Sequence, residues 1–425
     1  MTTTLIRWLT SPAFLRPLCV LLRKLPMLRL KESLWVTRHA DVVEVLRRDG
    51  DFGIDPAATK RFRRVIGPSF LAMDRSPEYE YQVGLLRQVV RSSDLPWIRD
   101  IAADHIAGLM DGAWSGGRID VVWLARMVPV RLVGSYFGVT GPDEVTMLRW
   151  IRGMFTYVFY GQSPEEAMES AGALHGHLKR LIEQRKAALA AGAQGHDDVL
   201  GRLLRLQRED PSITDDTVRC NLVGLVMVAV EETAKAVVYA IDELLRRPAI
   251  CEDAQKAAMA GDRDALKQQV FEAMRFKPNN PWVLRRFSAR ETTVAAGSRW
   301  ERRVRAGSRL LVVTLSAMFD ESAFHQPTRF RTDRSLDDYL IFGHGVHTCF
   351  GRMIAAVVVP EVTAAVLRLP NLRRAPGRQG RISYEGLLPS RLILESDDHT
   401  RWYPQAGTSP PTGIWTGAAM MDPAA

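Results

Sequence analysis

The sequence contains, at positions 342–351, the stretch Phe342-Gly343-His344-Gly345-Val346-His347-Thr348-Cys349-Phe350-Gly351. An apolar run of helical length, residues 352–359, follows it at once. A cysteine at such a loop-to-helix junction points its sulfur toward the first free N–H groups of the helix, which favour a thiolate over a thiol. The stretch therefore predicts, at Cys349, the soft, anionic ligand that an iron ion needs.

The residues around this cysteine suit a flat ligand. The glycines allow tight turns and a close approach of the backbone, while Phe342 offers an aromatic face and His347 a polar edge. The spacing F-x-x-G-x-H-x-C-x-G resembles the haem-binding loop of the cytochrome P-450 superfamily. Taken alone, a cysteine is most often a small buried hydrophobe, but here its partners are specified as well. The resemblance implies haem b as cofactor, with Cys349 as the metal ligand and Phe342, His347 and Gly351 beside the haem.

Length and composition bound the class of protein. With 425 residues, the chain exceeds the size at which one hydrophobic core usually stops growing, so length alone would predict two domains. Lys plus Arg, 57, against Asp plus Glu, 48, give a net charge of +9, and no basic run with interleaved aromatics indicates a nucleic-acid partner. The four cysteines lack C-x-x-C spacing, which argues against a disulfide scaffold or a zinc site and favours a reducing cytoplasm.

The resemblance implies a different organisation from the one that length predicts. It implies one large, mainly α-helical domain with small β-sheets (an α+β fold) over residues 33–397, built around a buried haem and crossed by a long central helix. Residues 1–32 are rich in leucine, but prolines and basic residues interrupt every window long enough to span a bilayer. We interpret them as an arm packed on the body of the protein, with contact to a membrane surface as the alternative. The Pro- and Gly-rich residues 398–425 are predicted to form a flexible tail.

The first part of the domain carries one candidate site residue. Residues 34–48 predict a short strand followed by a helix, and residues 51–74 an irregular segment that overlies the substrate in the family. Arg87 falls in the helix that sends an arginine to a haem propionate in the family. The residue four positions earlier is Val83, where the family often has His or Trp, so Tyr79 or Tyr81 is a candidate replacement.

A second chemical site lies in a long predicted helix. Thr214-Asp215-Asp216 caps a helical pattern that runs to Arg247 and is stopped by Pro248. At its centre, Glu232-Thr233 places a carboxylate next to a hydroxyl, which can feed protons to a bound oxygen ligand. The pair matches the acid-alcohol pair of the family. Val230 departs from the family glycine that lets this helix bulge, which puts ordinary oxygen activation in doubt.

The remaining candidates follow this helix. Glu272 and Arg275, spaced i and i+3, form a pair that the family buries against an arginine of a P-x-R-F segment, here Arg329. Arg285 falls at the family's propionate arginine, with Arg286 as its rival. The resemblance also implies a substrate pocket, and its candidate residues are Ala229, Val230, Trp282, Val283 and Leu387, the last in a hairpin turn.

Together these residues favour a haem-thiolate monooxygenase. As the resemblance implies, it would insert one oxygen atom from O2 into a small, mainly apolar organic substrate, in the manner of enzymes of secondary metabolism. Since the chain has no flavin or iron–sulfur motif, electrons would come from a separate ferredoxin or flavodoxin, docked on a basic face that includes Arg352. Two alternatives remain open at this point. One is a haem-thiolate enzyme that uses peroxide or rearranges its substrate without a redox partner, and the other is a haem protein that binds a ligand without turnover.

Overall fold

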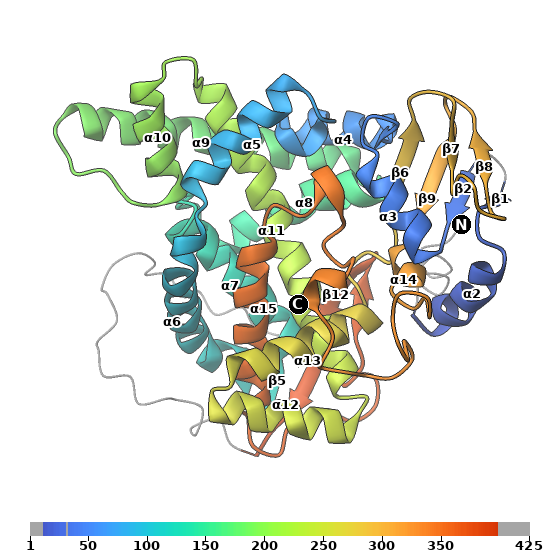
Figure 1. Cartoon of the computed structure of the whole chain (residues 1–425). Helices are drawn as coiled ribbons and strands as arrows, with labels where there is room; N and C mark the ends of the chain where they lie inside the picture. Colours follow the sequence, from blue (N-terminus) through green and yellow to red (C-terminus); the bar gives the residue numbers. More distant parts are fainter. Residues whose placement is uncertain (1–11, 31–32, 398–425) are drawn as a thin grey trace.

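The central element of the fold is the helix α11 (Asp215–Leu244), which crosses the middle of the molecule (Figure 1). The computed structural model describes residues 12–30 and 33–397. The Thr214 side chain accepts a hydrogen bond from the Thr217 N–H, as the predicted cap requires, and the helix ends three residues before the predicted Arg247. Most of its residues are buried because α7 (Val121–Ser135), α8 (Glu144–Tyr160), α13 (Arg263–Phe276) and α15 (Arg352–Leu367) pack around it.

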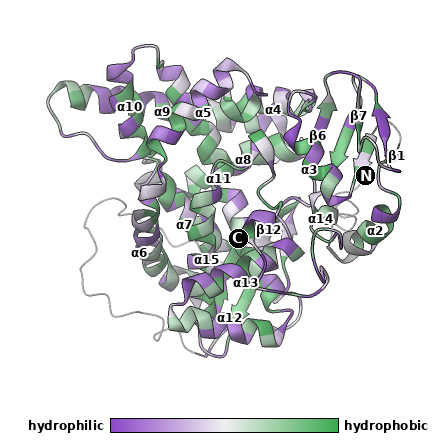
Figure 2. Ribbon diagram, in the orientation of Figure 1, coloured by the Kyte–Doolittle hydropathy of each residue, from purple (hydrophilic) through white to green (hydrophobic). Residues whose placement is uncertain are grey.

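The other helices form the outer part of this bundle, and their starts follow local sequence signals. Side chains of Asp55, Ser76 and Asp198 cap the first turns of α4 (Pro56–Ile66), α5 (Pro77–Val89) and α10 (Val199–Glu209). Figure 2 shows hydrophobic residues gathered along the central stretches and hydrophilic residues toward the periphery. These helices are α3 (His39–Arg47), α4 (Pro56–Ile66), α5 (Pro77–Val89), α6 (Leu95–Ala113), α9 (Pro164–Ala190), α10 (Val199–Glu209) and α12 (Pro248–Ala260).

One helix lies where the sequence predicts an irregular segment. Residues 51–74 contain the strand β3 (Phe52–Ile54) and the helix α4. The Asp55 carboxylate accepts from the Ala57 N–H, Pro56 stands at the first helical position, and Phe62, Val65 and Ile66 are buried on one face. The glycines and prolines of this segment lie at the helix ends, so the prediction of an irregular segment was wrong.

Small β-sheets complete the α+β fold at the edges of the bundle (Figure 1). The predicted strand and helix at 34–48 are present as β2 and α3. The largest sheet has the order β1-β2-β9-β6-β3, formed by β1 (Leu28–Leu30), β2 (Ser33–Val36), β9 (Arg309–Val312), β6 (Val283–Ser288) and β3, with β2 and β9 parallel. A second sheet and two hairpins contain β10 (Arg373–Arg374), β13 (Ile393–Glu395), β5 (Arg118–Asp120), β4 (Trp114–Ser115), β11 (Ser383–Glu385), β12 (Leu388–Arg391), β7 (Thr292–Val294) and β8 (Arg302–Val304).

The described part of the N-terminal arm packs on the body of the protein. Its helix α2 (Pro12–Lys24) contacts α14 (Thr314–Ala317), where Arg23 donates to the Ser316 carbonyl at 3.3 Å. The Thr37 hydroxyl donates to the Leu22 carbonyl at 3.2 Å. Among the described residues, no helix has the length and apolar character needed to span a membrane. Residues 1–11 and the predicted tail, 398–425, lie outside the described residues.

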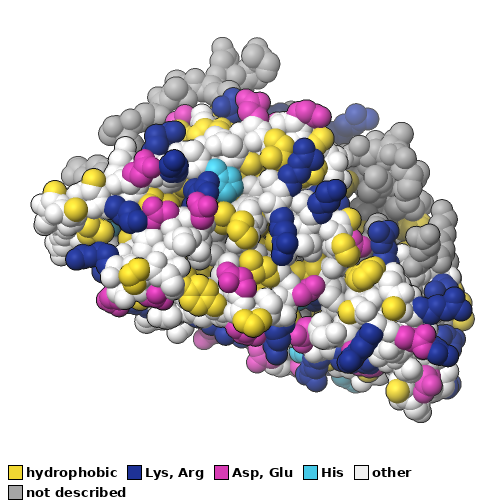
Figure 3. Space-filling model, turned by 90° about the horizontal axis from the view of Figure 1, so that it is seen from above, with side chains coloured by type: hydrophobic (Ala, Val, Ile, Leu, Met, Phe, Trp, Pro, Cys, Tyr) yellow, Lys and Arg dark blue, Asp and Glu magenta, His cyan; other side chains and the backbone are white. Residues whose placement is uncertain are grey.

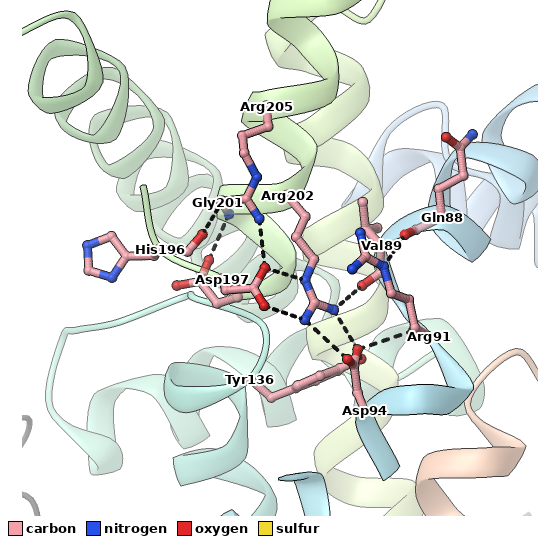
Figure 4. A network of polar contacts seen from close by, with 11 residues as sticks. Gln88, Val89, Arg91, Asp94, Tyr136, His196, Asp197, Gly201, Arg202 and Arg205 are labelled. Atoms are coloured by element: carbon pink, nitrogen blue, oxygen red, sulfur yellow. Dashed lines mark hydrogen bonds and ion pairs between the residues drawn. The ribbon is translucent and has the colours of Figure 1, made fainter. Parts of the chain in front are cut away.

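A buried ion-pair network fastens α10 to the bundle (Figure 4). Arg202 of α10 donates to both carboxylate oxygens of Asp94 and, at 2.9 Å, to the Val89 carbonyl. The Tyr136 hydroxyl donates to the same Asp94 carboxylate at 2.9 Å. Asp197 accepts from the other side of the Arg202 guanidinium at 3.0 Å. The network thus joins the chain before α6, the end of α7 and the start of α10.

Charges of both signs mix on the outer surface. On the face seen in Figure 3, Lys and Arg side chains alternate with Asp, Glu and apolar side chains. The basic residues on this face therefore do not form a single continuous stripe.

Candidate functional site

The cysteine loop is held by its own backbone and by α3. The Cys349 N–H donates to the Phe342 carbonyl at 2.8 Å, and the Thr348 N–H donates to the Gly345 carbonyl at 3.0 Å. Gly345 has a φ of +74°, and a Cβ atom there would lie 2.3 Å from the Leu46 carbonyl oxygen of α3. Only glycine fits this position, because both the dihedral angle and the close approach exclude a side chain.

Aromatic contacts fix the loop at both ends. The Phe342 ring lies 5.7 Å from that of Phe271 on α13, and the Phe350 ring 5.4 Å from that of Phe70. The Tyr79 hydroxyl of α5 donates to the Val346 carbonyl at 2.8 Å, and its ring meets the His347 ring edge-on. The predicted loop residues Phe342 and His347 thus contact the bundle directly, which gives the sulfur a rigid support.

Cys349 is accessible, yet its environment is that of a recess. Burial raises the pKa of the thiol to about 11, against the opposing effects of the Gly351 N–H and Arg352. The charge of Glu232 on α11 also raises the pKa of the thiol, so this carboxylate lies near enough to act on the sulfur. A soft metal ion is what stabilises a thiolate in such surroundings. The donor fits the iron of a haem, with the sulfur at the start of α15 as the sequence predicts.

The acid-alcohol pair lies in the middle of α11. Asn279 Nδ2 donates to Glu232 Oε2 at 2.9 Å, and Lys235 Nζ donates to Glu232 Oε1 at 3.2 Å. Thr233 is half-buried, and among the described residues its hydroxyl makes no hydrogen bond to its own helix. The hydroxyl therefore keeps its capacity to donate and accept a hydrogen bond.

The departure from the family pattern at Val230 has a visible counterpart. Val230 is fully buried, and α11 runs as an uninterrupted α-helix through this point. Ala229 beside it is half-buried. A β-branched side chain with restricted χ1 suits a regular helix, and no bulge forms here.

A set of basic groups fits the carboxylates of a haem. Arg286 is buried, and burial lowers the pKa of its guanidinium despite Asp74. Its Nε and His347 Nε2 are buried without a hydrogen-bond partner among the described residues, and His347 Nε2 lies 3.6 Å from Asp74 Oδ1. Buried donors without partners are rare, and an anionic group would satisfy both. The predicted Arg87 is exposed on α5, and the Arg285 side chain lies outside what the structure describes.

The pair Glu272 and Arg275 is present and fully buried. The guanidinium donates to both carboxylate oxygens, at 2.7 and 2.8 Å. The predicted third member differs: Arg329 is exposed and offers only its backbone carbonyl, 3.4 Å from Arg275 NH2. Arg334, 7% exposed, has its Nε 3.6 Å from Glu272 Oε1 instead. The Arg331 N–H donates to Glu272 Oε1 at 3.0 Å, so the chain passes this carboxylate. Arg334, five residues after Arg329, therefore reaches it.

The remaining pocket candidates are only partly described. Trp282 is half-buried before β6, and the Val283 side chain lies outside the described residues. Leu387 lies in the turn between β11 and β12, so the predicted hairpin is present. The structure adds Lys235 and Glu231, which the sequence pattern did not single out. Glu231 could have been found from the sequence, because a second acid directly before the pair needs a basic partner if it is buried. Its partners, Arg126 on α7 and Arg152 on α8, belong to no recognisable motif.

Comparison with known proteins identifies the family. The family model described as cytochrome P-450 matches residues 132–394, which is more than half of the chain. The chain belongs to the cytochrome P-450 family. It is 27% identical over 373 residues to the mycinamicin IV hydroxylase/epoxidase of Micromonospora griseorubida, covering 84% of this chain and 87% of that protein. It is 25% identical over 364 residues to the vitamin D(3) 25-hydroxylase of Pseudonocardia autotrophica, covering 80% and 82%.

A solved structure agrees with the fold of this cytochrome P-450. The LnmA cytochrome P-450 hydroxylase of Streptomyces atroolivaceus superposes with a TM-score of 0.73 at 24% identity, covering 89% of this chain and 96% of that one. The family binds haem b, and the relatives are monooxygenases of bacteria. The chain is therefore a cytochrome P-450 monooxygenase with haem b as cofactor, and the comparisons do not support a haem protein without turnover.

Proposed function

We propose that this cytochrome P-450 inserts one oxygen atom from O2 into a small, mainly apolar organic molecule, with electrons from a separate ferredoxin or flavodoxin. The observation that supports the proposal is the pair Glu232 and Thr233 in the middle of α11, where the Glu232 charge acts on the Cys349 thiol and Thr233 is half-buried. When bound at Cys349, the haem supplies the iron chemistry that activates dioxygen. The relatives named as hydroxylases support a hydroxylated organic product.

Different residues of this chain would hold the haem, transfer protons and contact the substrate. Cys349 Sγ would hold the iron, and Arg286 and His347, with Arg87 or Arg285, would pair with the propionates. Glu232 would hold a proton at its carboxylate and pass it to Thr233 Oγ1, which would donate it toward the dioxygen. Reduction of the second oxygen atom to water requires two protons and the two electrons that the redox partner supplies. The half-buried Ala229 and Trp282, with Leu387 in the hairpin turn, would contact the apolar part of the substrate.

The first experiment is the absorption spectrum of the reduced protein with carbon monoxide. A strongly red-shifted Soret band would support the thiolate ligand, and a band at the imidazole-type position would contradict it. Product formation is then compared between a reconstituted ferredoxin system and hydrogen peroxide alone, with the same substrate.

The pair can be tested by Thr233→Ala. We expect product formation with a ferredoxin donor to fall roughly tenfold or more, because general acid–base groups contribute factors of this size or greater. Turnover driven by peroxide should change little, since peroxide already carries the protons. Thr217→Ala, near the start of the same helix, is the control. Unchanged donor-driven turnover in Thr233→Ala would contradict the proton path.

A second candidate function rests on Val230. Because α11 does not bulge at this residue, the arrangement also favours an enzyme that takes peroxide without a redox partner. The two functions separate in Val230→Gly. If donor-driven turnover rises in that variant while peroxide-driven turnover stays constant, the native chain is adapted to peroxide.

A further inference from the structure

A neutral cluster of two arginines and two glutamates lies beside the acid-alcohol pair. Glu231, the residue before the pair, is fully buried. Its Oε1 lies 3.0 Å from Arg126 Nε of α7 and 3.3 Å from Arg152 Nε of α8. Arg152 NH2 also donates to Glu385 Oε2 at 2.6 Å. The reactions assigned above do not use this cluster.

The cluster holds both strands of the β11–β12 hairpin. Glu385 is the last residue of β11, and Arg126 NH2 donates to the carbonyl of Pro389 in β12 at 2.6 Å. The turn between them, Gly386 and Leu387, is thus fastened on each side. Gly386, with a φ of +59°, lies against the residue that follows the α8 C-cap, since a Cβ there would be 3.3 Å from Gln162 Oε1.

Stability alone does not account for this arrangement. Taking a carboxylate and two guanidinium groups out of water costs several kcal/mol per ion, and apolar residues of similar size usually serve as well. An isolated two-stranded hairpin is also marginal in water. What the cluster provides is a fixed position: Glu231 pairs with the arginines, and the residues that follow it on the same turn of α11 are Glu232 and Thr233.

We infer that Glu231 and Arg152 are positioning residues that set the place of Leu387 relative to the acid-alcohol pair and thereby decide which part of a substrate is presented. This inference rests on the proposed function only in taking the turn as part of the substrate pocket. The distance of Leu387 from α11 is fixed from both sides of the turn. Glu385 and the Pro389 carbonyl each bind an arginine that pairs with the buried Glu231 carboxylate.

The two ties differ in exposure, which makes one of them accessible to experiment. The Arg126–Glu231 pair is buried, with side chains 8% and 0% exposed, whereas Glu385 is 70% exposed. Salt screens an exposed pair far more than a buried one. The Arg152–Glu385 tie is therefore the part that salt or a conservative substitution releases while the fold stays intact.

The test uses the haem-loaded enzyme and the variant Glu385→Gln. The matched control is Glu291→Gln, which breaks an exposed Arg–Glu pair with Arg303 at the β7–β8 hairpin. Hydrogen exchange of the amides of residues 386–388 is measured at low salt and in high salt. Dissociation constants are measured for imidazole, which is small, and for clotrimazole, a bulky imidazole.

The expected result is specific to the turn. In Glu385→Gln, exchange at residues 386–388 should accelerate at least fivefold and the dissociation constant of clotrimazole should change at least fivefold, while that of imidazole stays within twofold. High salt should reproduce the effect in the wild type and in Glu291→Gln, but add nothing to Glu385→Gln. Exchange and clotrimazole binding within twofold of the wild type would overturn the inference.

Glu231→Gln extends the test to the buried carboxylate at the centre of the cluster. We expect a larger change than in Glu385→Gln, because both ties weaken together. If this variant does not fold, Glu385→Gln and the salt series still decide the question. Azole binding requires no electron donor, so a failure of the proposed redox partner would leave these measurements valid.

Discussion

At the scale of single residues, Arg286 carries a buried guanidinium whose Nε has no partner among the described residues. An unsatisfied buried donor costs free energy, so a propionate there would be strongly held. We expect Arg286→Gln to speed the transfer of haem to apomyoglobin roughly tenfold, since a hydrogen bond to a charged group contributes about 1.5–3 kcal/mol. Arg329→Gln, at an exposed position, should stay near the wild-type rate. Equal rates in the two variants would place the propionates elsewhere.

The sequence could predict some of these residues and not others, for physical reasons. Cys349 and its loop followed from a continuous pattern, in which Gly345 is required by its positive φ and its close approach to α3. Arg285 and Arg286 are neighbours in β6, and successive strand side chains point to opposite faces, so spacing alone does not tell which one is buried. Arg334, and not Arg329, lies beside Glu272 because of the path of the chain after Phe330, which no local pattern encodes.

His105 gives the stability a dependence on pH. Burial, with help from Arg131, lowers the pKa of His105 from 6.5 to about 4, and its Nε2 lies 2.9 Å from the Ser135 hydroxyl. Below pH 6.5 His105 binds a proton in the unfolded chain but stays neutral in the folded chain. The free energy of unfolding therefore decreases as the pH is lowered. Between pH 7.5 and 5 this residue should cost about 2 kcal/mol.

The measurement is urea unfolding of wild type and His105→Gln at both pH values. The variant should lose less stability than the wild type on acidification, because glutamine does not titrate. His196→Gln, in an exposed loop, is the control. The same acid loss in His105→Gln as in the wild type would contradict the assignment.

At the scale of elements, α10 depends on Arg202 for its attachment (Figure 4). Burial raises the pKa of Asp94, but the hydrogen bonds from Arg202 and Tyr136 lower it by more, so the pKa of this carboxyl lies below its ordinary value. Arg202→Met would leave this buried carboxylate without its cation, and we expect a loss of about 3–5 kcal/mol in urea unfolding. Arg205→Met removes an exposed partner of Asp197 and should cost less than about 1 kcal/mol. Similar losses in the two variants would show that burial of the pair is unimportant.

The helices also indicate which elements a sequence discloses. α11 could be predicted because Thr214 caps its start, Pro248 sets a limit to its end and the helical pattern between them is too long for a strand. α4 was missed because its eleven residues lie between breakers, and its apolar face has only a few positions. The cluster around Glu231 joins α7, α8, α11 and the β11–β12 hairpin, so it exists only after the chain has folded.

At the scale of the whole molecule, the net charge is +9, and some of the basic residues lie near the cysteine loop, where they can affect the docking of a partner. Arg352 follows the loop and is exposed, and Arg47 is exposed while its Nε donates to His344 Nε2 of the loop at 2.8 Å. Exposed charges at a docking surface act mainly on the rate of association. The proposed electron donor, if acidic, would therefore approach this rim of the molecule.

Arg352→Glu tests this approach with the intact enzyme. We expect haem reduction by an acidic ferredoxin, followed by stopped flow under carbon monoxide, to slow roughly tenfold at low ionic strength, since steering contributes factors of this order. The difference should vanish at high ionic strength, where the Debye length falls to about 3 Å. Arg303→Glu, on the exposed strand β8, preserves the net charge change at a remote position and should reduce at the wild-type rate. Equal slowing in both variants would mean that net charge, and no particular face, governs the encounter; an unchanged rate in Arg352→Glu would exclude this rim as the docking surface.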